Sequence, residues 1–199
     1  MRGTLCPKCG QPQEKEGLCA SCLSNPPAFK LMRSWAAFDD PIRPALHKLK
    51  YRRNLALGDA LAAHLARFVE SLEWPVDNVV PVPLGNQRFK ERGYNQVALI
   101  ARPLSLALGL TYKSAALRRT RETRSQVGLS AHERRQNVND AFTADAGFAR
   151  GRSVLLMDDV ATTGSTLSAC AGALYKGGAS GVYAITMARA LPHHSRDIV

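Results

Sequence analysis

The chain has 199 residues, 45% of them hydrophobic, which is enough for one well-buried domain with a small appendage. Lysine and arginine number 27 against 16 aspartate and glutamate, so the formal net charge is +11 and we expect polyanionic partners. No apolar run approaches the roughly 18 residues that span a bilayer, and residues 1–10 hold no apolar secretory segment, so we expect a cytoplasmic protein without membrane insertion.

Four of the five cysteines follow the spacing C-x2-C-x9-C-x2-C: Cys6, Cys9, Cys19 and Cys22. Each C-x2-C pair can place two thiolates around one ion, and two pairs complete a tetrahedral Zn2+ site. A segment of about 25 residues is too short to bury an apolar core, so its folding free energy must come from a cross-link. We favour a structural zinc ion, with disulfides as the alternative. We therefore expect a zinc ribbon over residues 1–27 and a second domain over residues 28–199.

Strand and helix patterns alternate along the rest of the chain. Strands are predicted over residues 34–38, 77–83, 112–117, 141–144, 154–157 and 181–188. Helices are predicted over residues 42–51, 55–72, 93–108 and 167–176, with a short helix at the capping box that begins at Ser130. Two basic segments, 84–95 and 118–137, are expected to form loops. This alternation favours an α/β fold in which helices flank a parallel sheet and a ligand binds at the carboxyl ends of the strands.

Residues 154–166, VLLMDDVATTGST, predict a site for a phosphorylated sugar. Four apolar residues predict a buried strand that ends before Asp158 and Asp159. Gly164 permits a tight turn, and the surrounding hydroxyl groups and the start of the next helix suit a phosphate. The two carboxylates would repel that phosphate, so we expect them to accept hydrogen bonds from sugar hydroxyls, as in a ribose 5-phosphate.

Two other interpretations of this segment compete with a sugar-phosphate site. An ordinary strand-to-helix turn would leave both acids in solvent or at a helix cap, but it requires fewer polar groups than this segment supplies. A nucleotide-binding strand would need a P-loop, and the chain has no Gly-Lys dipeptide and no G-x-G.

The same segment resembles the phosphoribosyl-diphosphate (PRPP) motif of type I phosphoribosyltransferases. The resemblance implies that Asp158 and Asp159 contact the ribose hydroxyls. It also implies a loop for the 5′-phosphate, formed by Ala161, Thr162, Thr163, Gly164, Ser165 and Thr166.

Two further segments widen the resemblance: residues 80–102, VPVPLGNQRFKERGYNQVALIAR, and residues 117–142, LRRTRETRSQVGLSAHERRQNVNDAF. Together with residues 154–166 they resemble the ComF family of competence-associated, phosphoribosyltransferase-like proteins, whose members commonly begin with a cysteine zinc ribbon. The resemblance covers about residues 6–189 and departs from the family pattern at Gly85 and Asn86, where relatives often have His-Pro. It implies Mg2+ bound with PRPP, and diphosphate-binding or lid roles for Arg88, Arg92, Asn95, Gln96, Arg118, Arg119, Arg121, Arg124, Arg134 and Arg135.

Three functions fit this sequence. The first is a phosphoribosyltransferase that releases diphosphate, with an acceptor and catalytic residues that the sequence does not identify. The second is a single-stranded DNA-binding competence factor that uses PRPP as a ligand or regulator, because residues 86–137 carry 11 Lys and Arg against 3 Glu and Tyr51, Phe89 and Tyr94 could stack on bases. The third is a PRPP-sensing scaffold with neither activity. The family resemblance also implies a competence helicase or other DNA-uptake proteins as partners.

Overall fold

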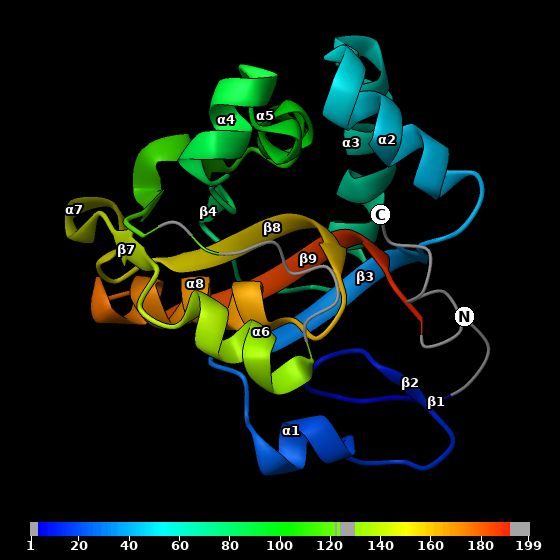
Figure 1. The fold of residues 1–199 in the computed structure, drawn as a ribbon, viewed down its shortest axis with the longest axis vertical. Helices are drawn as coiled ribbons and strands as arrows, with labels where there is room; N and C mark the ends of the chain where they lie inside the picture. Colours follow the sequence, from blue (N-terminus) through cyan, green and yellow to red (C-terminus); the bar gives the residue numbers. More distant parts are fainter. Residues whose placement is uncertain (1–3, 122, 124–129, 192–199) are drawn as a thin grey trace.

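A five-stranded parallel sheet forms the centre of the protein (Figure 1). The computed structural model describes residues 4–121, 123 and 130–191. The strands lie in the order β3-β9-β8-β4-β5, and every neighbouring pair is parallel. They are β3 (Leu31–Ala37), β4 (Asn78–Pro81), β5 (Thr111–Tyr112), β8 (Ser153–Ala161) and β9 (Gly181–Arg189). The predicted parallel α/β sheet is therefore confirmed.

Helices cover both faces of this sheet (Figure 1). One face packs against α2 (Ile42–Arg52), α3 (Leu55–Glu70) and α5 (Gln96–Ala107), and the other against α8 (Ser165–Lys176). Successive residues of β8 point to opposite faces, as strand geometry requires. Val154 and Leu156 therefore join the α8 cluster, whereas Leu155 and Met157 join the cluster of α2, α3 and α5.

Two small antiparallel sheets lie outside the central one. The cysteines lie in and around β1 (Thr4–Leu5), β2 (Pro12–Gln13) and the short helix α1 (Ala20–Ser24). The second small sheet pairs β6 (Leu117–Arg119) with β7 (Phe142–Ala144), and helix α6 (Ala131–Val138) comes between them in the chain. A short helix α7 (Ala146–Ala149) then leads towards β8.

Several element boundaries differ from the sequence-based expectation, and three of the differences change how a segment is assigned. Strand β8 does not end before the acids but continues to Ala161, because β9 pairs with it from Ser153 to that residue. The basic segment 84–95 is not all loop, since helix α4 (Asn86–Arg92) lies within it and ends at Gly93 with φ 72°. Residues 112–117 are not one strand: a 3-10 turn over Ser114–Ala116 separates β5 from β6.

In the part of the chain that the structure describes, no helix has both the length and the apolar character that a membrane crossing requires.

Candidate functional site at the end of β8

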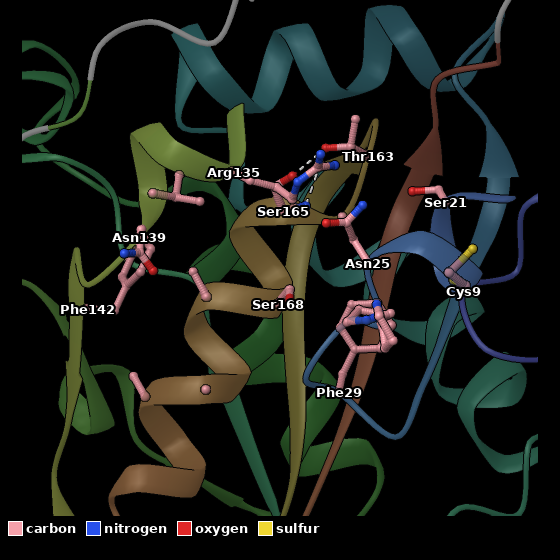
Figure 2. Close-up of a pocket in the computed structure, with 18 of the residues that line it drawn as sticks. Cys9, Ser21, Asn25, Phe29, Arg135, Asn139, Phe142, Thr163, Ser165 and Ser168 are labelled. Atoms are coloured by element: carbon pink, nitrogen blue, oxygen red, sulfur yellow. Dashed lines mark hydrogen bonds between the residues drawn. The ribbon is translucent and has the colours of Figure 1, made fainter. Parts of the chain in front are cut away.

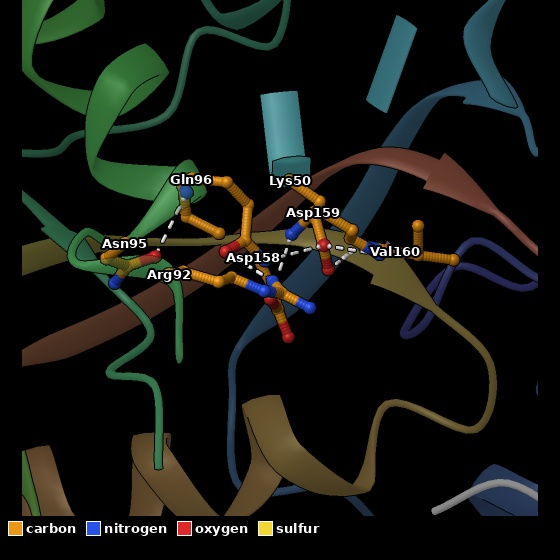
Figure 3. Close-up of polar contacts among 8 residues, drawn as sticks. Lys50, Arg92, Asn95, Gln96, Asp158, Asp159 and Val160 are labelled. Atoms are coloured by element: carbon orange, nitrogen blue, oxygen red, sulfur yellow. Dashed lines mark hydrogen bonds and ion pairs between the residues drawn. The ribbon is translucent and has the colours of Figure 1, made fainter. Parts of the chain in front are cut away.

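The two predicted sugar-binding acids lie near the end of β8 and belong to different surroundings (Figure 3). Asp159 faces α2 and α5: its Oδ2 lies 3.0 Å from Lys50 Nζ and accepts a hydrogen bond of 3.0 Å from Gln96 Nε2. Arg92 NH1 in turn donates to Gln96 Oε1 at 2.9 Å. Strand alternation places Asp158 on the side of α8, and its Oδ1 accepts the backbone N–H of Asp159 at 2.8 Å. Polar contacts therefore run continuously from α4 through the end of β8 to α2.

These surroundings shift the pKa values of the two carboxyl groups in opposite directions. Burial, followed by the charge of Asp159, raises the pKa of Asp158 from 3.8 to about 8. Burial also acts to raise the pKa of Asp159, but the Lys50 ammonium and the Gln96 amide outweigh it and hold that pKa below 3.8. The pKa of Asp158 therefore lies above that of Asp159, so Asp158 is the member of the pair that binds a proton more readily.

The segment after β8 turns tightly into α8. Gly164 precedes the helix with φ 76°, a left-handed conformation that strains any residue with a Cβ. The hydroxyl oxygens of Thr163 and Ser165 lie 2.7 Å apart at this turn. The backbone N–H of Ala190 donates to the Ala161 carbonyl at 2.9 Å, so β9 fixes the point where the loop begins. Hydroxyl groups and the positive end of α8 thus meet at one place, an arrangement that suits a phosphate.

A cavity of about 590 Å³ lies beside this loop, between α8, α6 and the residues that follow α1 (Figure 2). Thr163, Gly164 and Ser165 line it together with Arg135 of α6. Asp158 and Asp159 are not among its lining residues. The segment Ala161–Thr166 therefore borders both the cavity and the strand that carries the acids, and the acids lie outside the cavity.

The predicted diphosphate-binding residues of α4 and α5 divide by role. Arg92 and Gln96 belong to the polar cluster at Asp159. Asn95 instead caps α5, because its side chain accepts the Val97 N–H at 3.0 Å and donates to the Val82 carbonyl at 2.9 Å. Both ends of the Asn95 amide are thus engaged within the protein.

The predicted lid residues surround α6. Arg121 NH2 donates to the carbonyls of Asn137 at 3.1 Å and Asn139 at 2.8 Å, which joins the start of the segment to its end. The Arg119 guanidinium lies 5.1 Å from the centroid of the Phe142 ring. The remaining arginines are Arg88 and Arg118, both exposed, Arg134, which is half-buried on α6, and Arg124, which lies outside the described residues.

Lys50 also belongs to the candidate site at Asp159, although no sequence pattern predicts this. It occupies the last turn of α2, where the helix dipole alone would explain a basic residue. Its contact with Asp159 arises only because α2 packs over the carboxyl end of β8, more than a hundred positions later in the chain. No local pattern carries that information.

The four N-terminal cysteines converge as predicted: the sulfur atoms of Cys6, Cys9, Cys19 and Cys22 all lie within 4.8 Å of one another. The Cys9 and Cys19 sulfurs are 3.7 Å apart, close to the about 3.8 Å edge of a tetrahedron with Zn–S bonds of about 2.3 Å. The backbone N–H of Cys19 donates to Cys6 Sγ at 3.4 Å. The cluster could therefore hold a metal ion, and its thiol donors suit zinc.

A parallel sheet flanked by helices, together with four N-terminal cysteines that pack against the same core, defines an α/β protein with a cysteine cluster beside its sheet. The chain is 37% identical over 195 residues to DNA utilization protein YhgH of Escherichia coli K12, which covers 94% of this chain and 85% of that protein. It is 33% identical over 180 residues to competence protein F of Haemophilus influenzae, which covers 86% of this chain and 78% of that protein. Competence protein ComFC of Bacillus subtilis is 27% identical over 196 residues, or 94% of this chain and 78% of that protein. The chain belongs to this family, the ComF family.

Two solved structures are similar to this chain. Glutamine PRPP amidotransferase from B. subtilis is similar with a TM-score of 0.49 and 19% identity, over 71% of this chain and 30% of that chain. An adenine phosphoribosyltransferase is similar with a TM-score of 0.47 and 19% identity, over 74% of this chain and 78% of that chain. No protein-family model matches the sequence.

Proposed function

We propose that the protein binds PRPP at the carboxyl end of β8. The observation that supports this proposal is the order of groups along one segment: an acid pair at the end of a central strand, a left-handed glycine, and the start of α8. Residues Ala161–Thr166 would hold the 5′-phosphate, and Asp158 and Asp159 would meet the ribose hydroxyls. A hydroxyl both donates and accepts, so it complements a pair in which Asp158 binds a proton more readily than Asp159 does.

The diphosphate at the other end of the sugar needs cationic donors. Arg92 donates to Gln96, which in turn donates to Asp159. Arg88 lies one helical turn before Arg92 on α4. Arginine presents a planar fork that pairs with two phosphate oxygens. Mg2+, when bound with PRPP, would neutralise part of the diphosphate charge.

With an acceptor present, the same site would perform phosphoribosyl transfer. The bond between ribose C1 and the diphosphate oxygen breaks, the electron pair leaves with the diphosphate, and the acceptor forms the new bond to C1. The arginines would stabilise the departing charge, while the segment that carries Arg119, Arg121 and α6 would exclude water from the sugar.

Calorimetric titration with PRPP and Mg2+ tests the binding. A hydrogen bond to a charged group is worth about 1.5–3 kcal/mol, so Asp159→Asn should weaken binding about 10- to 150-fold. A hydrogen bond to a neutral group is worth about 0.5–1.5 kcal/mol, so Asp158→Ala should weaken binding about 2- to 13-fold. Asp59→Asn, an exposed change on α3, is the matched control and should bind as the parent does. Equal affinity in all three variants, with unchanged circular dichroism, would remove the acids from the site. Diphosphate release during incubation with a panel of bases and oligonucleotides would establish transfer.

We propose a structural zinc ion for the four-cysteine cluster. Four thiolates complete a tetrahedron and leave no open position for a substrate. The expected content is one zinc per chain, measured by atomic absorption on protein purified without chelator.

A second candidate function, binding of single-stranded DNA, is favoured by a surface where α2 and α4 meet. Arg92 lies 5.5 Å from the centroid of the Tyr51 ring, and the Arg53 N–H donates to the Tyr94 hydroxyl at 2.8 Å, so the two helices are adjacent. Tyr51 is 64% exposed and Phe89 is 51% exposed. Exposed cations accompany these rings on the same two segments: Lys48, Arg52, Arg53, Arg88 and Lys90. Exposed aromatic rings among cations suit unpaired bases on a phosphate backbone.

Fluorescence anisotropy with a labelled single-stranded oligonucleotide tests this surface. Base stacking is worth about 1–3 kcal/mol, so Tyr51→Ala and Phe89→Ala should each weaken binding about 5- to 150-fold. Leu106→Ala on α5 removes a side chain that is 75% exposed and serves as the control. If all three variants bind equally, the bases do not stack on these rings. Tyr94 is a weaker candidate than the sequence indicated, because it is half-buried and its hydroxyl also donates to the Leu49 carbonyl at 2.7 Å.

A further inference from the structure

A buried arginine lies between the cysteine cluster and the central sheet. Arg189 is the last residue of β9 and is only 1% exposed. Its guanidinium donates to the Gln11 side-chain carbonyl at 3.0 Å and to the Cys9 backbone carbonyl. The third nitrogen of the guanidinium, Nε, is buried and has no hydrogen-bond partner among the described residues. A buried cation with an unused donor is unfavourable unless a negative group faces it.

The cysteine cluster supplies such a negative group. Four thiolates around one Zn2+ carry two net negative charges in a largely buried place, since Cys6, Cys9 and Cys22 are all at most 8% exposed. The Arg189 guanidinium donates to the backbone carbonyl of Cys9, which places its positive charge beside the cluster. A guanidinium there can cancel half of the net charge.

The same arginine adjoins the phosphate loop. In the pairing of β8 with β9, Arg189 is opposite Ala161, the residue at which the loop begins, and the next amide, Ala190, donates to the Ala161 carbonyl. A second connection runs through Met32, whose N–H donates to the Lys8 carbonyl at 2.9 Å. The Met32 side chain also approaches Gly164, where an added Cβ would lie 3.3 Å from Met32 Cε. The cysteine segment thus reaches the start of the loop through Arg189 and Gly164 in the loop through Met32.

From these contacts we infer that Arg189 is a positioning residue that balances the charge of the zinc-thiolate centre and makes zinc occupancy stabilise the loop Ala161–Thr166. The charge of the zinc-thiolate centre fixes the position of Arg189, which is the last residue of β9. The end of β9 is in turn hydrogen-bonded to the start of the loop at Ala161. The inference rests on the proposed zinc centre, and it goes beyond that centre's role in folding the N-terminal segment.

Zinc affinity, measured by competition with a chromophoric chelator, tests the charge balance. Loss of a residue that supports metal ligands weakens metal binding about 10- to 100-fold, and Arg189→Gln should do so. Arg189→Lys, which keeps the charge, should recover most of the affinity. Arg33→Gln is the matched control. The half-buried Arg33 also donates from NH1 to a carbonyl of the cysteine segment, that of Pro7 at 3.1 Å, but this hydrogen bond is exposed to solvent, so affinity should change by no more than about twofold.

The same variants loaded with Co2+ add a spectroscopic test. The thiolate-to-cobalt absorption bands should shift in Arg189→Gln, where a positive charge near sulfur is lost, and stay in place in Arg33→Gln. Equal zinc affinities and equal spectra for Arg189→Gln and Arg33→Gln would overturn the inference. A parent protein that binds no zinc would instead contradict the zinc centre itself.

Hydrogen exchange on the parent protein tests the link to the loop without any substitution or ligand. Chelation of zinc should speed exchange at the Ala190 amide and the loop amides. The amides that join β4 to β5 at the far edge of the sheet should keep their protection. Equal protection of the loop with and without zinc would overturn the inference even if Arg189→Gln failed to fold.

Discussion

The ion pair between Lys50 and Asp159 is the contact on which the polar cluster depends most, and Lys50→Met removes it while keeping the length of the side chain. The two charged atoms are 3.0 Å apart, and the side chains of Lys50 and Asp159 are 26% and 14% exposed. At an effective dielectric constant of about 20, two unit charges at this distance attract by about 5–6 kcal/mol. Desolvation of both groups offsets most of this attraction. Because the pair is intermediate between exposed and buried pairs, we expect a net loss of about 1–3 kcal/mol at neutral pH.

The pH dependence gives this prediction its sign. Asp159 has a lowered pKa in the folded protein, so its contribution is fully present above its unfolded value near 3.8 and disappears as the pH falls below that value. Without Lys50, Asp159 loses the largest influence that keeps its pKa low. The difference in stability between parent and variant should therefore be largest at and above about pH 5 and shrink below about pH 4.

Urea unfolding at pH 7 and at pH 3.5 measures both quantities. Lys48→Met is the matched control, because Lys48 is exposed two positions earlier on the same helix. It should change the free energy of unfolding by no more than about 0.5 kcal/mol at either pH. Two variants of equal stability at pH 7, or a difference that persists undiminished at pH 3.5, would refute the reasoning.

Three other changes have definite expected outcomes. Gly164→Ala places a Cβ at φ 76° and against Met32, so it should lower the free energy of unfolding by about 1–2 kcal/mol and weaken phosphate binding. Gly172→Ala adds a Cβ in open space on α8 and should not destabilise the protein, and chemical denaturation compares the two variants. Cys6→Ser should reduce zinc to well below one per chain, and a full equivalent in a metal assay would contradict the four-thiolate centre. The raised pKa of Asp158 means that the parent loses stability as the pH rises from about 4 to about 8; Asp158→Asn should not show this loss, and parallel pH profiles would contradict the assignment.

The sequence was sufficient wherever the determinant is local. The strand, the glycine turn and the start of α8 follow from adjacent residues, and the C-x2-C pairs bring sulfurs together by spacing alone. The end of β8 was predicted too early because two acids look like the end of a strand, whereas pairing with β9 extends the strand past them.

Partners that are distant in sequence could not be predicted in this way. Nothing near Lys50 indicates Asp159, and nothing near Arg189 indicates Cys9, because each contact depends on how whole elements pack. The same limit explains Asn95, which looked like a ligand residue in a basic segment. Its cap on α5 is a local contact with Val97, but its bond to the Val82 carbonyl depends on how α5 packs beside β4.

The two proposed activities share structural elements, and this has a thermodynamic consequence. Helix α2 carries Lys50, which pairs with Asp159, and next to it Tyr51, which belongs to the proposed DNA surface. Arg92 belongs to the polar cluster and to the proposed DNA surface, since it donates to Gln96 and lies over the Tyr51 ring. A sugar that engages Asp159 must compete with Lys50 and Gln96 for the same carboxylate, so it acts on the end of α2 and on α4 together. Binding of a phosphorylated ribose and binding of a nucleic acid strand should therefore change each other's affinity, and by linkage the two changes must be equal.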